Sequence, residues 1–180
     1  MVVTLSLLSF SAYSQNFNVG TNLFDWGNYG TINAEAGVSL SQHYSIVAGL
    51  KCNPWDFSKG GDAVHNKMFV AFAGARYWPW YVNSGLWFQG IGQFADYSIA
   101  GTWRHALDKG TAAGVGVSAG YTYMLSAHFN VEFGLGCWAG YLFKHSLYQC
   151  SNCMILRELE SGPRAFIDFN NITLSVAYVF

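Results

Sequence analysis

Residues 114–125, GVGVSAGYTYML, decide the fold of this chain. Their odd positions carry mainly large apolar or aromatic side chains, and their even positions carry Gly, Ser or Thr until Met124. Alternation with a period of two residues is typical of a β-strand, whose successive side chains point to opposite faces of a sheet. The same alternation recurs over residues 129–141, where Trp138 is the exception, and up to Phe180. The sequence therefore predicts an all-β chain.

The composition indicates where the two faces of these strands point. Of the 180 residues, 52% are apolar and 18% aromatic, but only 11% are charged, against about 25% in an ordinary globular domain. A water-soluble β-protein covers its outer face with charge, whereas the second face here is small and nearly uncharged. The pattern suits the opposite arrangement, in which large side chains face lipid and small polar ones line a narrow lumen.

The same composition excludes two other classes of protein. A mean hydropathy of +0.18 excludes a disordered chain, because disorder requires low hydrophobicity. A formal net charge of −1 without a basic stripe gives no basis for binding nucleic acid.

Eight alternating segments predict an eight-stranded antiparallel transmembrane β-barrel. An even number of strands closes the sheet, so that no unpaired edge lies in lipid. Short turns alternate with the long connections 54–66, 99–110 and 142–164, as in outer-membrane barrels with short periplasmic turns and long extracellular loops. The predicted strands are 17–26, 31–40, 44–53, 67–78, 85–97, 111–125, 129–141 and 165–180.

The first residues are typical of an export signal. An apolar run over residues 1–13 ends at the small-x-small site Ala12-Tyr13-Ser14, which predicts a signal peptide over 1–14 and a mature barrel over 15–180. No basic residue precedes this run, so we expect the natural start to lie upstream of Met1.

Aromatic side chains gather at both ends of the predicted strands, as expected for rings that lie in the two headgroup layers of a membrane. The belt predicted at the short turns consists of Tyr44, Tyr77, Trp78, Trp80, Tyr81, Trp87, Tyr123, Phe129, Tyr178 and Phe180. The belt predicted at the long loops consists of Trp26, Trp55, Phe57, Tyr97, Trp103 and Tyr141.

A polar plug is predicted inside the barrel, because the alternation directs two acidic and two basic side chains inward, together with several amides. An eight-stranded barrel is just wide enough inside for side chains, and an unpaired charge there is costly. A structural plug is therefore expected, and a proton- or ligand-handling site is the alternative. The predicted plug residues are Glu35, Lys51, Arg76, Glu132, Gln89 and Gln93, beside Asn22 and Asn33.

The four cysteines fall into two groups. Cys150 and Cys153 lie in the longest predicted loop, where we expect a disulfide that stiffens the loop, because the redox motif needs a βαβ context and zinc needs four ligands. Cys52 and Cys137 fall on lipid-facing positions of strands that are not neighbours, so we expect free thiols there. No metal site and no cofactor are predicted.

Catalysis is not expected either. The only grouping of a nucleophile, a base and an acid at the outer rim is Ser146 and His145 with Glu158 or Glu160. Adjacent side chains of a strand point to opposite faces, so His145 and Ser146 do not ordinarily meet.

Two short turns share the pattern Ser-x-His-(Tyr/Phe)-x-(Ile/Val)-x-x-Gly-Leu, over residues 41–50 and 126–135. We interpret this echo as one hairpin structure used twice. We expect His43 and His128 to bind carbonyl groups of the turns rather than to carry out chemistry.

The long connections carry apolar side chains among charged ones. Exposed groups of this kind mark partner surfaces, and the alternative is that they pack on each other over the barrel mouth. Residues 155–160 are expected to form a short helix over this mouth before Gly162-Pro163. The predicted partner surface consists of Trp55, Phe57, Trp103 and Tyr148.

Several short motifs resemble known sequences. The end of the chain, Tyr178-Val179-Phe180, resembles the terminal strand that the barrel-assembly machinery recognises in outer-membrane proteins. The motifs TNLFD (21–25), NPW (53–55), ARYW (75–78) and C-x-x-C (150–153) resemble the landmarks of a Bacteroidota family of small eight-stranded outer-membrane β-barrels. That family is classed as a domain of unknown function and is often encoded near fimbrillin-like genes. The resemblance implies an outer-membrane location in a Gram-negative bacterium, but no activity.

The sequence thus predicts an integral outer-membrane barrel with a structural or interaction role, and not an enzyme. Its expected contacts are outer-membrane lipid, the assembly machinery during insertion, and a surface or fimbrial protein. Two alternatives stay open: a hydrolase of envelope lipid at the outer rim, and a narrow conduit for small molecules.

Overall fold

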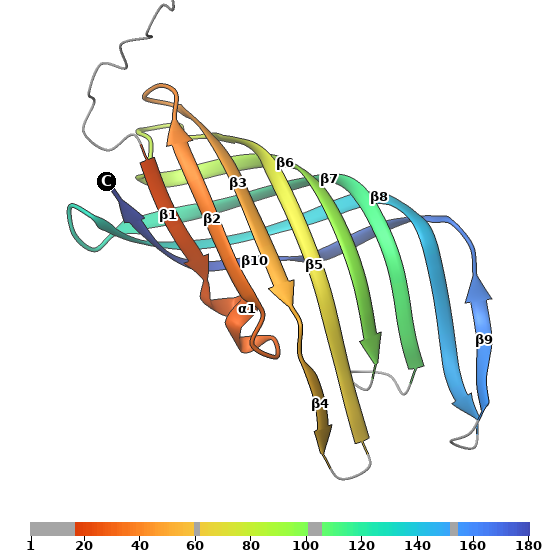
Figure 1. The fold of residues 1–180 in the computed structure, drawn as a ribbon. Helices are drawn as coiled ribbons and strands as arrows, with labels where there is room; N and C mark the ends of the chain where they lie inside the picture. Colours follow the sequence, from red (N-terminus) through yellow and green to blue (C-terminus); the bar gives the residue numbers. More distant parts are fainter. Residues whose placement is uncertain (1–16, 60–61, 101–105, 152–154) are drawn as a thin grey trace, which may run out of the picture.

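The computed structural model describes residues 17–59, 62–100, 106–151 and 155–180, so the predicted signal peptide lies outside the described residues. One short helix and ten strands follow one another along the chain (Figure 1). They are β1 (Phe17–Asn22), α1 (Leu23–Gly27), β2 (Ile32–Ser39), β3 (Tyr44–Asn53), β4 (Asp56–Lys59), β5 (Asp62–Tyr77), β6 (Gly85–Ala100), β7 (Ala106–Met124), β8 (Phe129–Ser151), β9 (Ile155–Ser161) and β10 (Arg164–Val179).

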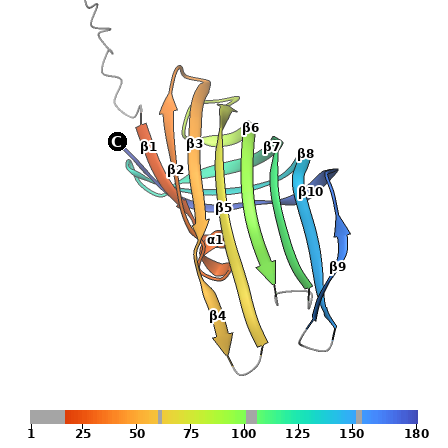
Figure 2. The ribbon, with the colours of Figure 1, turned by 45° about the vertical axis from the view of Figure 1, so that its right-hand side comes forward.

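Eight of the strands form a closed antiparallel barrel. β1 pairs with β10 and with β2, and the sheet continues through β3, β5, β6 and β7 to β8, which pairs with β10. β4 pairs with β5 and β9 with β8, and both project from one end of the ring (Figures 1 and 2). The predicted eight-stranded antiparallel barrel is therefore confirmed. Among the described residues, no helix is long and apolar enough to cross a membrane.

The two ends of the barrel differ. The short-turn end carries the connections β2–β3, β5–β6 and β7–β8, and the long-loop end carries α1, β4 and β9 (Figure 1). The start of β1 and the end of β10 lie together at the short-turn end.

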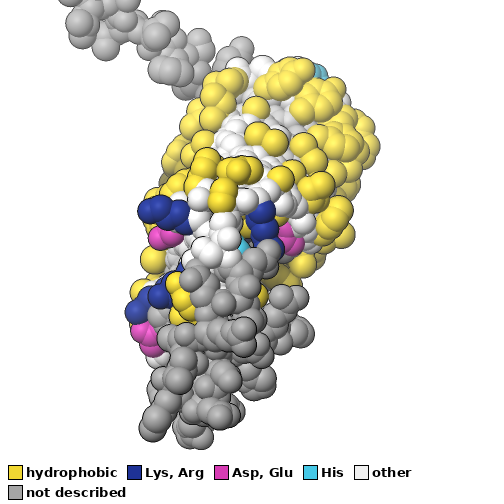
Figure 3. Space-filling view, turned by 90° about the vertical axis from the view of Figure 1, so that its right-hand side faces the viewer, with side chains coloured by type: hydrophobic (Ala, Val, Ile, Leu, Met, Phe, Trp, Pro, Cys, Tyr) yellow, Lys and Arg dark blue, Asp and Glu magenta, His cyan; other side chains and the backbone are white. Residues whose placement is uncertain are grey.

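The large side chains of the strands point outward, as the alternation predicts. In β7, Val115 and Val117 are 69% and 62% exposed, whereas Ser118 and Thr122 are buried inside the barrel. In β8, the exception Trp138 also points inward and is buried. Figure 3 shows one side of the outer surface: hydrophobic side chains cover its upper part, and the visible Lys, Arg, Asp and Glu side chains lie around its middle and below. The outer surface of the barrel is thus largely apolar, and its interior holds both polar residues and a cluster of apolar ones.

Several strands run past their predicted ends toward the long-loop end. β5 begins at Asp62, β7 begins at Ala106 and β8 continues to Ser151, so much of the predicted loops is extended. The expected helix over residues 155–160 is wrong, because this segment forms β9 and pairs with the extension of β8. A helix of six residues is marginal on its own, whereas the neighbouring strand supplies hydrogen-bond partners for its backbone.

The first predicted strand, 17–26, is also too long. β1 ends at Asn22, whose side chain accepts a hydrogen bond from the backbone N–H of Phe24 at 3.1 Å and caps α1. Asn is among the residues that best satisfy the free N–H groups at the start of a helix. The chain therefore turns into the short helix α1 at the mouth of the barrel.

The two echoing turns have the same structure. The N–H groups of Leu40 and Leu125 donate to the carbonyls of Tyr44 and Phe129, each at 2.9 Å. Nδ1 of His43 lies 2.9 Å from the carbonyl of Trp78, and Nδ1 of His128 lies 2.9 Å from the carbonyl of Val179. Both histidines thus bind carbonyl groups, as expected, but these carbonyls belong to the neighbouring strand ends and not to the turns themselves. Each histidine fastens a turn to the end of the next strand in the sheet.

We expect His43→Ala and His128→Ala to destabilise the barrel by similar amounts, because each removes one hydrogen bond of the same geometry. The expected loss is about 1 kcal/mol for each variant. Urea unfolding of the variants in the same detergent measures it. A large loss in one variant and none in the other would contradict the equivalence of the two turns.

Candidate functional site

The interior of the barrel is organised around Arg76 of β5, which is 2% exposed. Its guanidinium donates through Nη1 to Glu132 of β8 at 3.0 Å and through Nη2 to Glu35 of β2 at 2.9 Å. Its Nε donates to Gln89 of β6 at 2.9 Å. A planar guanidinium, whose donors have fixed directions, can bind several acceptors at once better than an ammonium group can. One side chain thus joins strands from different sides of the barrel.

Two tryptophans enclose this arginine. The guanidinium carbon lies 4.4 Å from the ring centre of Trp87 and 5.5 Å from that of Trp78, within the range of cation–π contacts. Both rings are completely buried, and the indole N–H of Trp78 donates to Ser45 at 3.0 Å. The prediction that Trp78 and Trp87 belong to an outer aromatic belt is therefore wrong. The predicted belt residue Tyr97 also faces inward, where it packs against an internal apolar cluster.

The short-turn end is closed by the chain itself. In the connection from β5 to β6, Val82 and Asn83 are buried, and Asn83 adopts a φ of 62°. The Asn83 side chain accepts a hydrogen bond from Asn18 of β1 at 2.8 Å, and its carbonyl accepts one from Asn130 of β8 at 3.0 Å. This connection therefore folds back across the lumen, which the sequence did not indicate beyond its turn-forming residues.

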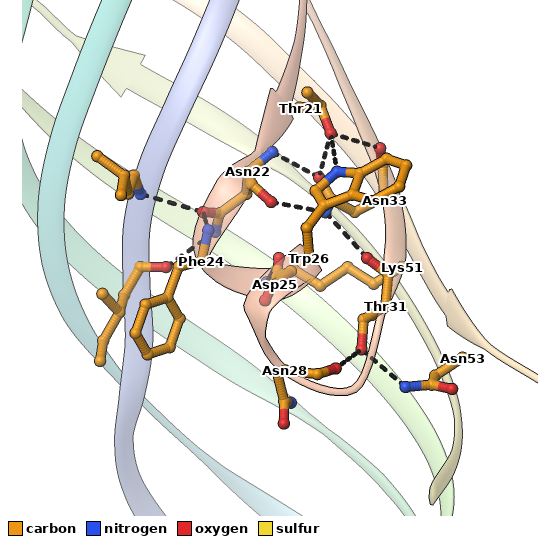
Figure 4. A network of polar contacts seen from close by, with 12 residues as sticks. Thr21, Asn22, Phe24, Asp25, Trp26, Asn28, Thr31, Asn33, Lys51 and Asn53 are labelled. Carbon is orange, nitrogen blue, oxygen red and sulfur yellow. Dashed lines mark hydrogen bonds and ion pairs between the residues drawn. The ribbon is translucent and has the colours of Figure 1, made fainter. Parts of the chain in front are cut away.

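The long-loop end holds a second polar network around α1 (Figure 4). Lys51 of β3 forms an ion pair with Asp25 of α1 at 2.8 Å. The side chain of Asn33 bridges to the backbone of Asn22, accepting from its N–H at 2.6 Å and donating to its carbonyl at 2.9 Å. Thr21 also donates to the Asn33 side chain, at 3.1 Å. The network fixes α1 against the barrel wall.

The predicted plug residues thus belong to two groups and not to one balanced set. Glu35, Arg76, Glu132 and Gln89 meet around the Arg76 guanidinium, whereas Lys51 pairs with Asp25. Asp25 was missed, because residues 17–26 were interpreted as one strand.

Little empty space remains between the two groups. A cavity of about 30 Å³ lies among polar side chains that include Glu35, Lys51 and Gln93. A cavity of this size among polar groups has room for ordered water.

We expect no discrete conductance from the barrel in planar bilayers. The reason is that the folded-back connection, the Arg76 cluster and the small cavity follow one another along the lumen. Single-channel recording of the purified protein tests this. Reproducible single-channel current steps would contradict a filled lumen and would support the alternative of a narrow conduit for small molecules.

A further group lies near the long-loop end. The pairing of β7 with β8 shifts by one residue between Thr111 and Ala112, and His145 of β8 lies just beyond this bulge. The His145 side chain points inward and is 3% exposed. Its Nε2 lies 3.3 Å from a carboxylate oxygen of Asp108 and 3.4 Å from a guanidinium nitrogen of Arg164. Below it lies an apolar cluster of Val70, Ala95, Ala112, Trp138 and Leu142.

Of the residues of the hydrolase alternative, His145 and Ser146 lie on opposite faces of β8. His145 is buried in the interior, and the neighbouring Ser146 follows it in the strand and faces the other side. The side chains of Glu158 and Glu160 lie outside the described residues. Within the described segments, no group of three or more His, Cys, Asp or Glu side chains is placed to hold a metal ion.

The predicted partner surface is described only in part. Trp55 is 44% exposed, and its indole N–H donates to the carbonyl of Gly30 at 3.0 Å. Tyr148 is partly buried. Trp103 and the side chain of Phe57 lie outside the described residues.

Of the four cysteines, the structure describes the bonding state of Cys52 and Cys137 only. The disulfide expected between Cys150 and Cys153 also lies outside the described residues. Cys52 and Cys137 are free, and Cys52 is exposed on the outward face of β3.

Comparisons with known proteins give a family but no activity. A family model described as "Protein of unknown function (DUF3575)" matches residues 1–180. No curated protein and no solved structure matches the chain.

Proposed function

The chain belongs to the DUF3575 family of proteins of unknown function, and we propose that it is an integral outer-membrane β-barrel with a structural, non-enzymatic role. In this proposal the filled barrel is an anchor. The extended hairpins at its long-loop end contact a partner at the cell surface.

The observation that carries the proposal is the band of apolar side chains around the outside of the barrel. On β5 the outward face has no charge from Phe69 to Tyr77, and Lys67 follows at the long-loop end. A tilted strand needs roughly 9–11 residues to cross a membrane, which this stretch provides. Such a surface would be unfavourable in water, because soluble monomers rarely expose large continuous apolar patches.

Aromatic pairs at the short-turn end support the same placement. The rings of Tyr44 and Tyr77 lie 5.2 Å apart, and those of Phe129 and Tyr178 lie 5.1 Å apart, all on the outward face. Amphipathic rings favour the interface between lipid and water. In an outer membrane this end would face the periplasm.

A structural role is supported by the interior. The Arg76 and Lys51 cations inside are paired with carboxylates, and the cavity between the two groups is narrow and lined by polar side chains. The charged and aromatic residues left for recognition lie at the long-loop end, where β4, β5, β8 and β9 form two projecting hairpins. The sequence resemblance to proteins encoded near fimbrillin-like genes suggests a fimbrial or other surface protein as the partner.

The experiment that tests the role is extraction of the tagged protein from its own membrane in mild detergent, followed by mass spectrometry of what is retained. We expect a stoichiometric surface protein with the wild type. Replacing residues 56–65 or 146–161 by short turns should remove that partner from at least one variant. The shortened barrels must still be inserted in the membrane. Retention of nothing by the wild type, or of the same partner by both shortened barrels, would contradict the anchor role.

A further inference from the structure

Two grooves adjoin each other on the outward face of the barrel. The first, of about 690 Å³, is apolar and crosses β2, β3, β5 and β6. Its floor consists of small side chains, and its walls include Leu50 and Phe94. The floor residues are Ala34, Ala36, Ala48, Ala71, Ala73 and Gly92.

The second groove, of about 630 Å³, lies nearer to the long-loop end and crosses β5, β6, β7 and β8. It is lined by three lysines, Lys67, Lys109 and Lys144, each on a different strand. Hydroxyl groups of Ser98 and Ser146 lie among them.

The pairing of β5 with β6 shows that the grooves are continuous. Ala71 pairs with Phe94 in the apolar groove, and the next outward pair is Phe69 with Asp96. The following outward pair, Lys67 with Ser98, already belongs to the basic groove. From Ala71 to Lys67 the distance along the strand is about 13 Å. A single ligand can therefore occupy both grooves.

The charges of the second groove favour an anion. Within the described part of the chain, neither Lys109 nor Lys144 forms an ion pair, whereas Lys67 is 2.7 Å from Asp56. Asp96 accepts a hydrogen bond from Thr111 at 2.8 Å. Among the described residues, two ammonium groups are thus left without an ion pair in a groove that also contains the hydroxyl of Ser146.

We propose that these joined grooves bind one lipid of the leaflet at the long-loop end, with its phosphorylated headgroup on Lys109 and Lys144 and an acyl chain over the alanines. The inference rests on the proposed membrane placement. A basic groove alone would suit any phosphate, but the adjoining apolar groove gives a place for the hydrocarbon chain of the same molecule. Phosphate groups attract basic residues at a membrane surface, and acyl chains fill apolar concavities.

Native mass spectrometry of the detergent-solubilised full chain tests the proposal, with diphosphoryl lipid A as the probe and monophosphoryl lipid A as the comparison. We expect one diphosphoryl lipid A to stay bound to the wild type. K109Q/K144Q should retain about tenfold less, and K109R/K144R should retain as much as the wild type. Equal retention by the Gln and Arg variants would overturn the headgroup assignment.

A second pair of variants tests the acyl groove without a change of charge. Ala73→Leu fills its floor and should reduce retention, whereas Ala139→Leu, on the outward face of β8 away from both grooves, should not. Equal retention by both variants, or complete displacement of the lipid by millimolar inorganic phosphate, would overturn the lipid proposal in favour of a simple anion site. All variants are first checked for membrane insertion. Failure of the wild type to insert would overturn the proposed function itself.

Discussion

Replacement of Arg76 by Met is expected to destabilise the barrel by roughly 3–5 kcal/mol, or to prevent its folding. The substitution keeps a long side chain between the two tryptophan rings but leaves Glu35 and Glu132 without their cation. Glu132 is buried, and from the part of the chain that the structure describes its carboxylate then keeps only a hydrogen bond from Thr122 at 3.2 Å. The measurement is the free energy of unfolding in urea, with the protein in one detergent throughout.

The matched control removes the acids as well. In the triple variant R76M/E35Q/E132Q no charge remains in this cluster, and the amides can bond with Gln89 and Thr122. We expect this variant to recover most of the lost stability, because breaking a buried ion pair costs far more than replacing all of its members. If the triple variant were as unstable as R76M, the explanation by unpaired charge would be wrong.

Gly134→Ala is the second substitution with a large expected effect. A Cβ atom at this position would lie 2.7 Å from the ring of Trp87, with the backbone carbonyl of Ala119 at 3.2 Å. Because the Trp87 ring is held between Gly134, Gly120 and Arg76, it has little freedom to move. Overpacking of this kind typically costs about 1–3 kcal/mol, and the same urea titration measures it.

Gly90→Ala is the matched control, because a Cβ at Gly90 has no atom within 4 Å. We expect its stability to stay close to that of the wild type. In a Trp87→Leu background, Gly134→Ala should cost less than in the wild type, because the smaller side chain leaves room for the new methyl group. An equal loss for the Gly90 and Gly134 variants would show that the effect comes from the backbone and not from Trp87.

The barrel could be predicted because the alternation of large and small side chains indicates to which face of the sheet each strand residue points. The same rule also held for the interior acids and bases, which all point inward. It does not state how far along the barrel a side chain lies, and this is why Lys51 was wrongly grouped with Arg76. Lys51 pairs with Val70 across the ladder, and Arg76 lies six positions farther along β5, or about 20 Å from Val70.

The interior position of Trp78 and Trp87 was available in the sequence but was not used. Trp87 is two residues before Gln89 and Trp78 is two residues after Arg76, and both reference residues were already assigned to the lumen. Their position near strand ends suggested a headgroup belt instead. The charge of Arg76 explains why the two rings lie inside instead: their π-faces stabilise the guanidinium in the lumen together with its carboxylate partners.

The closed short-turn end and the helix α1 could not be foreseen from strand patterns. Both depend on amide side chains that bond across long sequence separations, such as Asn18 with Asn83 and Asn22 with the backbone N–H of Leu174. Periodicity carries no information about such contacts. The contact between Asn18 and Asn83 also holds the β5–β6 connection across the short-turn end.

Gel mobility of the full chain in detergent tests whether the chain is a membrane-inserted barrel. A folded barrel resists unfolding by the detergent of the gel unless it is boiled, so we expect the unboiled and boiled protein to migrate differently. We also expect the protein to stay in the membrane fraction after a wash with carbonate or urea. Identical migration, together with recovery of a monomer that is soluble without detergent, would show that the chain is not a membrane-inserted barrel.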